Sequence, residues 1–127
     1  MSNLSQKESI TSIRHDKLLN DVTNLVSRKW TLAIVRALDI HTKRHSELNK
    51  ELLGITQKVL TETLRDMERS GIVDRIIHPT IPPRVEYQLT NTGLELARLS
   101  KEFASWFDTH HEDLYRAQKS YDRRAKS

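Results

Sequence analysis

The chain has 127 residues, of which 36% are hydrophobic and 30% charged, and its formal net charge is +4. This size and composition predict a single domain with helical extensions and a modest core. The absence of cysteine excludes disulfides, thiolate-ligated zinc and thiol redox sensing. No apolar run is long enough to cross a bilayer, and residues 1–13 lack a signal-peptide core, so we expect a cytoplasmic protein without membrane contact.

Positive charge is distributed unevenly along the chain. The formal charge is +2 over residues 1–41, +1 over 42–90, −3 over 91–115 and +4 over 116–127. Much of the excess therefore lies in the last twelve residues, so overall basicity is weak support for nucleic-acid binding. Such a function must depend on where individual cations lie.

The first third of the chain predicts two helices. Residues 1–14 are polar and serine-rich, and we expect them to be flexible or loosely helical. Asp16 is a candidate cap for a helix whose apolar side chains recur at three- and four-residue spacings, namely Leu18, Leu19, Val22, Leu25 and Val26. The segment Trp30 to Leu38 is apolar nearly all round, as a central, covered helix would be. Asp39 to Arg44 is a polar link that has room for a very short strand.

The middle of the chain predicts two helices joined by a tight turn. Ser46 is the expected N-cap of the first helix, whose buried side would be Leu48, Leu52 and Leu53. Gly54 would end that helix in a left-handed conformation, and Thr56 would cap the next one. The second helix has its core line at Leu60, Leu64 and Met67, and Gly71 would close it. So short a link forces a sharp angle, which is typical of a helix-turn-helix.

A hairpin and a long helix are predicted to follow. Ile72 to Ile77 is β-branched, and Val85 to Leu89 alternates apolar and polar residues, so both segments favour strands. The intervening prolines cannot donate ladder hydrogen bonds and belong at the tip of the hairpin. Thr90 is the expected cap of the last helix, which carries Leu94, Leu96, Leu99, Phe103, Trp106 and Phe107. The order of elements predicts a mainly α fold with a small β hairpin: a winged helix-turn-helix with N- and C-terminal dimerisation helices.

The residues expected to meet DNA lie on the polar face of the 57–70 helix and around it. Its first turns would enter the major groove, where Lys and Arg donate to guanine, Thr contacts a thymine methyl and Glu accepts from cytosine. Arg84 follows two stiff prolines and suits a phosphate or the minor groove. The candidate set is Arg44, His45, Thr56, Gln57, Lys58, Thr61, Glu62, Arg65, Arg75 and Arg84.

Simpler explanations exist for each of these features. The helix can be an ordinary amphipathic helix with a hydrated charged face. Arg84 can be part of a rigid turn in which it pairs with Glu86 or Asp74.

Several segments resemble the HxlR-type family of regulators. The resemblance rests on Lys29-Trp30, on Arg44 to Leu48, on Leu53 to Thr61, and most specifically on Pro82-Pro83-Arg84-Val85-Glu86-Tyr87. It covers roughly residues 18–107. It implies a MarR-like winged helix, a homodimer and prokaryotic transcriptional control. Many members carry a sensing cysteine before the Lys-Trp pair; this chain has none, and His45 stands where an aromatic residue is usual.

A homodimer is also expected from the apolar side chains of the first and last helices. The proposed dimer residues are Leu18, Val22, Leu25, Leu99, Phe103, Trp106 and Phe107. Two reading helices would then lie about 34 Å apart, one turn of DNA. Adjacent His110 and His111 point about 100° apart and do not chelate as a pair, so no metal site or cofactor is expected.

The predicted organisation is a flexible N-terminus (1–14), a winged domain with dimerisation helices (15–115, DNA-reading core 44–90) and a basic tail (116–127). The predicted function is a non-enzymatic, sequence-specific regulator that binds double-stranded DNA with the 57–70 helix and the 78–84 wing. A protein–protein interaction module and a non-specific architectural DNA binder remain as alternatives. A small-molecule effector, bound near Trp30 and Phe103, is a further possibility.

Overall fold

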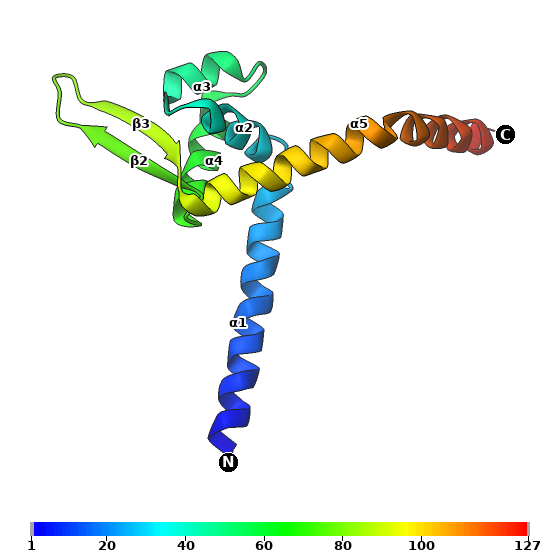
Figure 1. Cartoon of the computed structure of the whole chain (residues 1–127), viewed down its shortest axis with the longest axis horizontal. Helices are drawn as coiled ribbons and strands as arrows, with labels where there is room; N and C mark the ends of the chain where they lie inside the picture. Colours follow the sequence, from blue (N-terminus) through cyan, green and yellow to red (C-terminus); the bar gives the residue numbers. More distant parts are fainter. Residues whose placement is uncertain (1, 127) are drawn as a thin grey trace.

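The structure is a computed structural model that describes residues 2–126. In chain order its elements are α1 (Ser2–Val26), α2 (Thr31–Ile40), β1 (Lys43–Arg44), α3 (His45–Glu51), α4 (Gln57–Arg69), β2 (Val73–His78), β3 (Arg84–Leu89) and α5 (Asn91–Lys126). Helices α2, α3 and α4 gather at one end of the sheet, while the β2–β3 hairpin projects away from them (Figure 1). The predicted mainly α fold with a winged helix-turn-helix is confirmed.

The core lies where α2, α3 and α4 meet the near end of the sheet. Its fully buried side chains include Ile34 and Val35 of α2, Leu48 of α3, and Leu60 and Leu64 of α4. Burying a side chain of this size stabilises the fold by about 1.5–3 kcal/mol. These contacts fix α4 against the rest of the domain.

The turn between α3 and α4 is built from local signals. Gly54 has a φ of 94°, which glycine adopts without steric cost, and Ile55 is buried beneath the turn. Thr56 caps α4 as predicted, because its side-chain oxygen accepts a hydrogen bond from the backbone N–H of Val59 at 3.1 Å. The tight link between the two helices is therefore confirmed.

Two predictions about α3 were wrong. Its N-cap is Arg44, not Ser46, because the side chain of Glu47 accepts the Arg44 backbone N–H at 3.1 Å and the helix begins at His45. Leu53 is 87% exposed, since α3 has ended before it and the chain has turned outward.

The sheet is antiparallel, with strand order β1-β3-β2. The short β1 pairs Lys43 with Tyr87, so the polar link after α2 does contain a very short strand, for which the sequence left room. Strands β2 and β3 pair from Val73 opposite Leu89 out to His78 opposite Arg84. The prolines lie in the loop between these two strands, as predicted.

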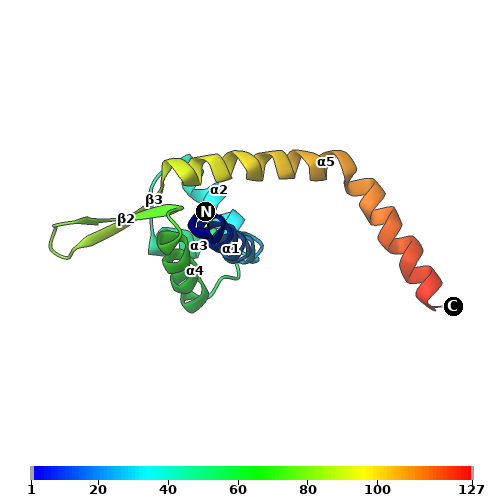
Figure 2. The same cartoon turned by 90° about the horizontal axis from the view of Figure 1, so that it is seen from below.

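The terminal helices are longer than the sequence patterns indicated. Helix α1 begins at Ser2 and not near Asp16, because residues 2–16 contain no glycine or proline that would interrupt a helix. Helix α5, capped by Thr90 through the Gly93 N–H at 3.0 Å, includes the basic tail and ends at Lys126. The two helices leave the domain in different directions, and α5 crosses the core before bending away (Figure 2).

Candidate nucleic-acid interface

Helix α4 is held so that one face is buried and the other is open. Leu60, Leu64 and Met67 are buried at three- and four-residue spacings, and Thr63 donates its hydroxyl to the Val59 carbonyl at 2.7 Å. Residues at the alternate positions must then point away from the core. The outward positions predicted from sequence are exposed: Gln57, Lys58, Thr61 and Arg65.

The outward face is not uniform. Glu62, unlike its exposed neighbours, is half-buried, and it places one negative charge beside Lys58 and Arg65. Thr56, the cap, is exposed, so the N-terminus of α4 is itself open to solvent. Backbone N–H groups at a helix N-terminus favour an anion such as phosphate.

Thr61 and His45 form a contact that joins the two helices of the motif. The Nε2 atom of His45 lies 3.0 Å from the Thr61 hydroxyl oxygen. This contact orders the half-buried imidazole and occupies the hydroxyl of Thr61. The methyl group of Thr61 is then the part left for an apolar contact, the kind that a thymine methyl makes.

A cavity of about 270 Å³ separates α4 from the sheet. It is lined by Thr61, Arg65, Glu68, Arg75 and Tyr87. Glu68 and Arg75 form an ion pair across it, with Arg75 Nε 3.6 Å from the Glu68 carboxylate. Helix α4 and the root of the hairpin are therefore linked by charge as well as by packing.

Tyr87 stands at this junction, and its phenol is partly shielded from water. Burial raises the pKa of Tyr87 above its ordinary value of 10.0, because the phenolate would lose hydration. Arg75 lowers that pKa and Glu68 raises it, in agreement with their opposite charges.

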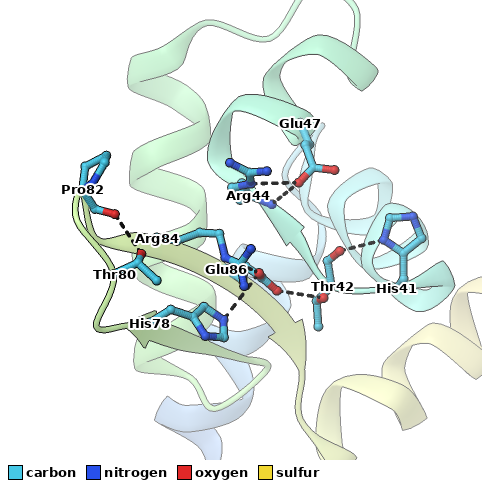
Figure 3. A network of polar contacts seen from close by, with 9 residues as sticks. All are labelled: His41, Thr42, Arg44, Glu47, His78, Thr80, Pro82, Arg84 and Glu86. Atoms are coloured by element: carbon cyan, nitrogen blue, oxygen red, sulfur yellow. Dashed lines mark hydrogen bonds and ion pairs between the residues drawn. The ribbon is translucent and has the colours of Figure 1, made fainter.

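The wing is the far end of the β2–β3 hairpin, defined as residues 78–84. At its tip Thr80 donates its hydroxyl to the Pro82 carbonyl at 2.8 Å, and the Ile81–Pro82 peptide bond is cis. Arg84 is exposed but paired: its Nε lies 3.0 Å from Oε1 of Glu86 (Figure 3). The simpler alternative, in which Arg84 pairs with Glu86, is thus present in the structure.

Glu86 gathers three contacts from three parts of the chain (Figure 3). Its Oε1 meets Arg84, and its Oε2 accepts the hydroxyl of Thr42 at 3.1 Å. His78 Nε2 also lies 3.4 Å from Oε1, but the geometry makes no hydrogen bond, and that buried nitrogen has no hydrogen-bond partner within the described part of the chain. From the sequence, Glu86 is expected only as one partner for Arg84, and its position in the alternating strand is the one local feature that points to it.

The basic residues before α3 divide into two kinds. Arg44 is exposed, with its Nε 3.6 Å from Glu47, and stays a candidate for phosphate. Lys43, the residue before it, is buried and paired with Glu51. Lys43 therefore serves the fold, because a buried ammonium requires a charged partner.

An ion pair that the sequence did not indicate connects α4 to the end of α1. Arg28 Nη1 donates to Asp66 Oδ2 at 2.6 Å, between the α1–α2 link and the third turn of α4. The two residues are 38 positions apart, so no local spacing pattern points to the contact.

The candidate dimer residues lie on two surfaces of the protomer. Leu18, Leu99, Phe103, Trp106 and Phe107 are exposed, and Phe103 stacks on Trp106 with ring centroids 5.9 Å apart. Val22 is half-buried. Leu25 is 3% exposed and packs in the protomer's own core, so its predicted place at a dimer surface is corrected.

Trp30 and Phe103, near which a small-molecule effector was expected to bind, lie in different surroundings. Trp30 packs against the core and approaches Gly54, whereas Phe103 lies on the exposed face of α5. Over residues 2–126, no cluster of three or more His, Asp or Glu side chains has the spacing to hold a metal ion. Within the same range, no helix combines the length and apolarity needed to span a membrane.

Comparison with known proteins adds to this geometry. The profile of the HxlR-like helix-turn-helix family matches residues 25–115. An uncharacterized HTH-type transcriptional regulator of Methanothermobacter thermautotrophicus is 36% identical over 93 residues, which is 71% of each chain.

Two solved structures are similar in fold and sequence. A protein described as a MarR-family transcriptional regulator from Enterococcus faecalis V583 aligns with a TM-score of 0.68 and 38% identity, covering 80% of this chain and 92% of that one. The reduced form of the transcriptional regulator YodB from Bacillus subtilis aligns with a TM-score of 0.64 and 31% identity, covering 70% and 87%.

Proposed function

This chain belongs to the HxlR-like helix-turn-helix family of transcriptional regulators, and from this premise we propose that it is a homodimer that binds specific double-stranded DNA. Helix α4, within the 57–70 segment, reads the major groove, and the 78–84 wing contacts flanking DNA. The protein has no enzymatic activity in this role.

The observation that carries the proposal is the open face of α4. Its first two turns expose Gln57, Lys58 and Thr61, and Arg65 follows one turn later. Lys58 and Arg65 take part in none of the ion pairs found among residues 2–126. Both cations are therefore available for guanine acceptors without first losing an internal partner.

The residues around α4 have supporting roles in this proposal. Thr56 and the α4 N-terminus face a phosphate, and Arg44 and His45 contact the DNA backbone from the start of α3. Glu62 accepts from cytosine. Arg75 and Arg84 approach the flanking DNA from the hairpin.

Dimerisation would use the exposed apolar residues of α1 and α5. Exposed Phe103, Trp106 and Phe107 lie within five positions on a helix that projects beyond the core, and such a patch is costly to leave in water. A second copy would cover it. The proposed interface consists of Leu18, Val22, Leu99, Phe103, Trp106 and Phe107.

The test is to select binding sites from randomised duplexes with the purified full chain. The selected duplex and an unrelated duplex of equal length are then compared by fluorescence anisotropy over about 50–200 mM salt. We expect a preference for the selected duplex that survives at the higher salt. Binding without sequence preference and with a steep salt slope would instead indicate an architectural DNA binder. Absence of binding to any duplex would favour a protein–protein module and overturn the proposal.

A further inference from the structure

We propose that Glu86 is a specificity-determining residue that holds the arginine of the wing in an internal ion pair until a DNA phosphate replaces the carboxylate. The inference rests on the proposed DNA-binding function and goes beyond it. In this proposal the wing binds DNA only where a phosphate can take the place of the Glu86 carboxylate, because Arg84 must exchange one anionic partner for another.

The first support is the charge of the hairpin. Between Val73 and Leu89 the chain carries two arginines and two acids, so the formal charge of the hairpin is zero. Both arginines are paired with glutamates: Arg75 with Glu68 at 3.6 Å and Arg84 with Glu86 at 3.0 Å. Among residues 2–126, the cations of α4 that face solvent take part in no ion pair. The free wing therefore offers less electrostatic attraction than its sequence suggests.

The second support is the way in which Glu86 is fixed. Its side chain is only 21% exposed, and its second oxygen accepts the hydroxyl of Thr42. The carboxylate is thus anchored from the β1 side of the sheet and cannot simply follow Arg84 outward. Arg84 is the more exposed partner, at 47%, and is the one able to swing toward DNA.

The third support is the exchange itself. Arginine presents five N–H donors on three nitrogens, and the ion pair with Glu86 is formed through Nε, 3.0 Å from the carboxylate oxygen. A phosphate can first engage the terminal nitrogens and then displace the carboxylate, in a pairing of the same charge type. Where the DNA backbone does not approach the wing closely, the internal pair persists. Glu86 therefore lowers binding to unrelated sequences more than binding to a duplex that positions a phosphate at the wing.

The test compares Glu86→Gln with wild type on a mixed-sequence duplex of about three turns. Glutamine keeps the shape of the side chain and an oxygen for Thr42 but removes the charge. We expect binding that is about two- to tenfold tighter at low salt, with the log–log salt slope steeper by about 0.9 for each wing. Discrimination between the selected and the mixed-sequence duplex falls.

Two further variants show whether Glu86 acts through Arg84. In the Arg84→Ala background, Glu86→Gln should give a much smaller gain, so the two changes are non-additive. Glu95→Gln is the matched control: it removes the same charge from an Arg–Glu pair on α5, formed with Arg98, and should leave binding unchanged. In the free protein, the nuclear magnetic resonance signal of the Arg84 Nε–H should move in Glu86→Gln and also when the wild type is titrated with duplex.

The outcomes separate this inference from the proposed function. If Glu86→Gln binds no more tightly than wild type, or gains equally with and without Arg84, Glu86 merely supports the hairpin and the inference is overturned while DNA binding stands. If the wild type binds no duplex at all, both proposals fail.

Discussion

Single residues of this protein differ mainly in whether their charges are already paired. The arginines of the hairpin have glutamate partners, whereas Lys58 and Arg65 on α4 face solvent. An unpaired cation can bind DNA without first breaking an internal contact, so the strongest side-chain contributions to binding are expected from α4. The pairs at Arg75 and Arg84 instead make the response of the wing depend on its partner.

Replacement of Arg65 by alanine should weaken binding to the selected duplex by about 1–3 kcal/mol, the value of a good base contact. Lys58→Ala should act similarly, and both should reduce sequence discrimination. The control is Arg69→Ala, which removes the same charge from the last turn of α4. Equal effects of Arg65→Ala and Arg69→Ala in titrations by fluorescence anisotropy would show that α4 contributes only general charge.

Tyr87 should ionise at a pH above 10, because burial raises its pKa. The difference in ultraviolet absorbance titrations between wild type and Tyr87→Phe isolates its phenolate signal. Since the folded pKa exceeds the unfolded one, the folded state binds the proton more tightly. The contribution of Tyr87 to the free energy of unfolding is therefore fully present below pH 10 and is lost as the pH rises through the pKa of the folded state. A difference signal centred at or below 10 would contradict the burial of Tyr87.

Whole elements are joined by a small number of close contacts. Arg28 and Asp66 connect the end of α1 to α4, and Arg75 and Glu68 connect α4 to β2. At the start of α5, Gly93 lies against the backbone of Ile72, where a Cβ on residue 93 would come within 2.1 Å of the Ile72 carbonyl oxygen. Thr90 reinforces this junction by donating its hydroxyl to the Gly71 carbonyl. The orientation of α5 relative to the hairpin is therefore set by a backbone contact that has no room for a side chain.

The change Gly93→Ala should destabilise the protein by about 1–3 kcal/mol, because the clash is with backbone and cannot be relieved by a rotamer change. Urea unfolding followed by circular dichroism measures the loss. Thr92→Ala alters an exposed neighbour in the same turn and should stay within about 0.5 kcal/mol of wild type. If both variants unfold at the same urea concentration, α5 does not pack as tightly on Ile72 as the structure indicates.

The molecule as a whole has a small core and two long helices that extend from it (Figure 1). Every residue of α5 from Lys101 to Lys126 is exposed, including the large aromatic side chains of this segment. A monomer would leave that surface in water, and this is the reason for assigning it to a second copy. The same arrangement leaves α4 and the wing free to meet DNA.

The dimer proposal predicts that Phe103→Glu or Trp106→Glu yields monomers, because a buried carboxylate without a partner is costly at an interface. Light scattering at micromolar concentration measures the mass. Ile40→Glu makes the same kind of change at an exposed site on α2, outside the proposed interface, and should leave the dimer intact. A wild-type protein with the mass of one chain would overturn the proposal.

Local signals in the sequence were sufficient for most of the fold. The left-handed Gly54, the Thr56 cap and the spacing of Leu60 and Leu64 act within a few residues, so they define the helix-turn-helix without knowledge of the rest. The prolines likewise placed the tip of the hairpin. Helix ends were less predictable: α1 continues to Ser2, and α3 begins at His45, because competing caps differ by little free energy.

The sequence by itself determined the class of protein, the outward face of α4 that we propose to read DNA, and the absence of a thiol, because these follow from residue types and short spacings. Only the tertiary structure decided which charges are available. It buried Lys43 against Glu51, joined Arg28 to Asp66, placed Leu25 in the core and set Glu86 between Thr42 and Arg84. Apart from Arg84 and Glu86, which are close in sequence, these contacts join residues that a local pattern does not connect. The physical reason is that the partner of a side chain depends on the packing of whole elements.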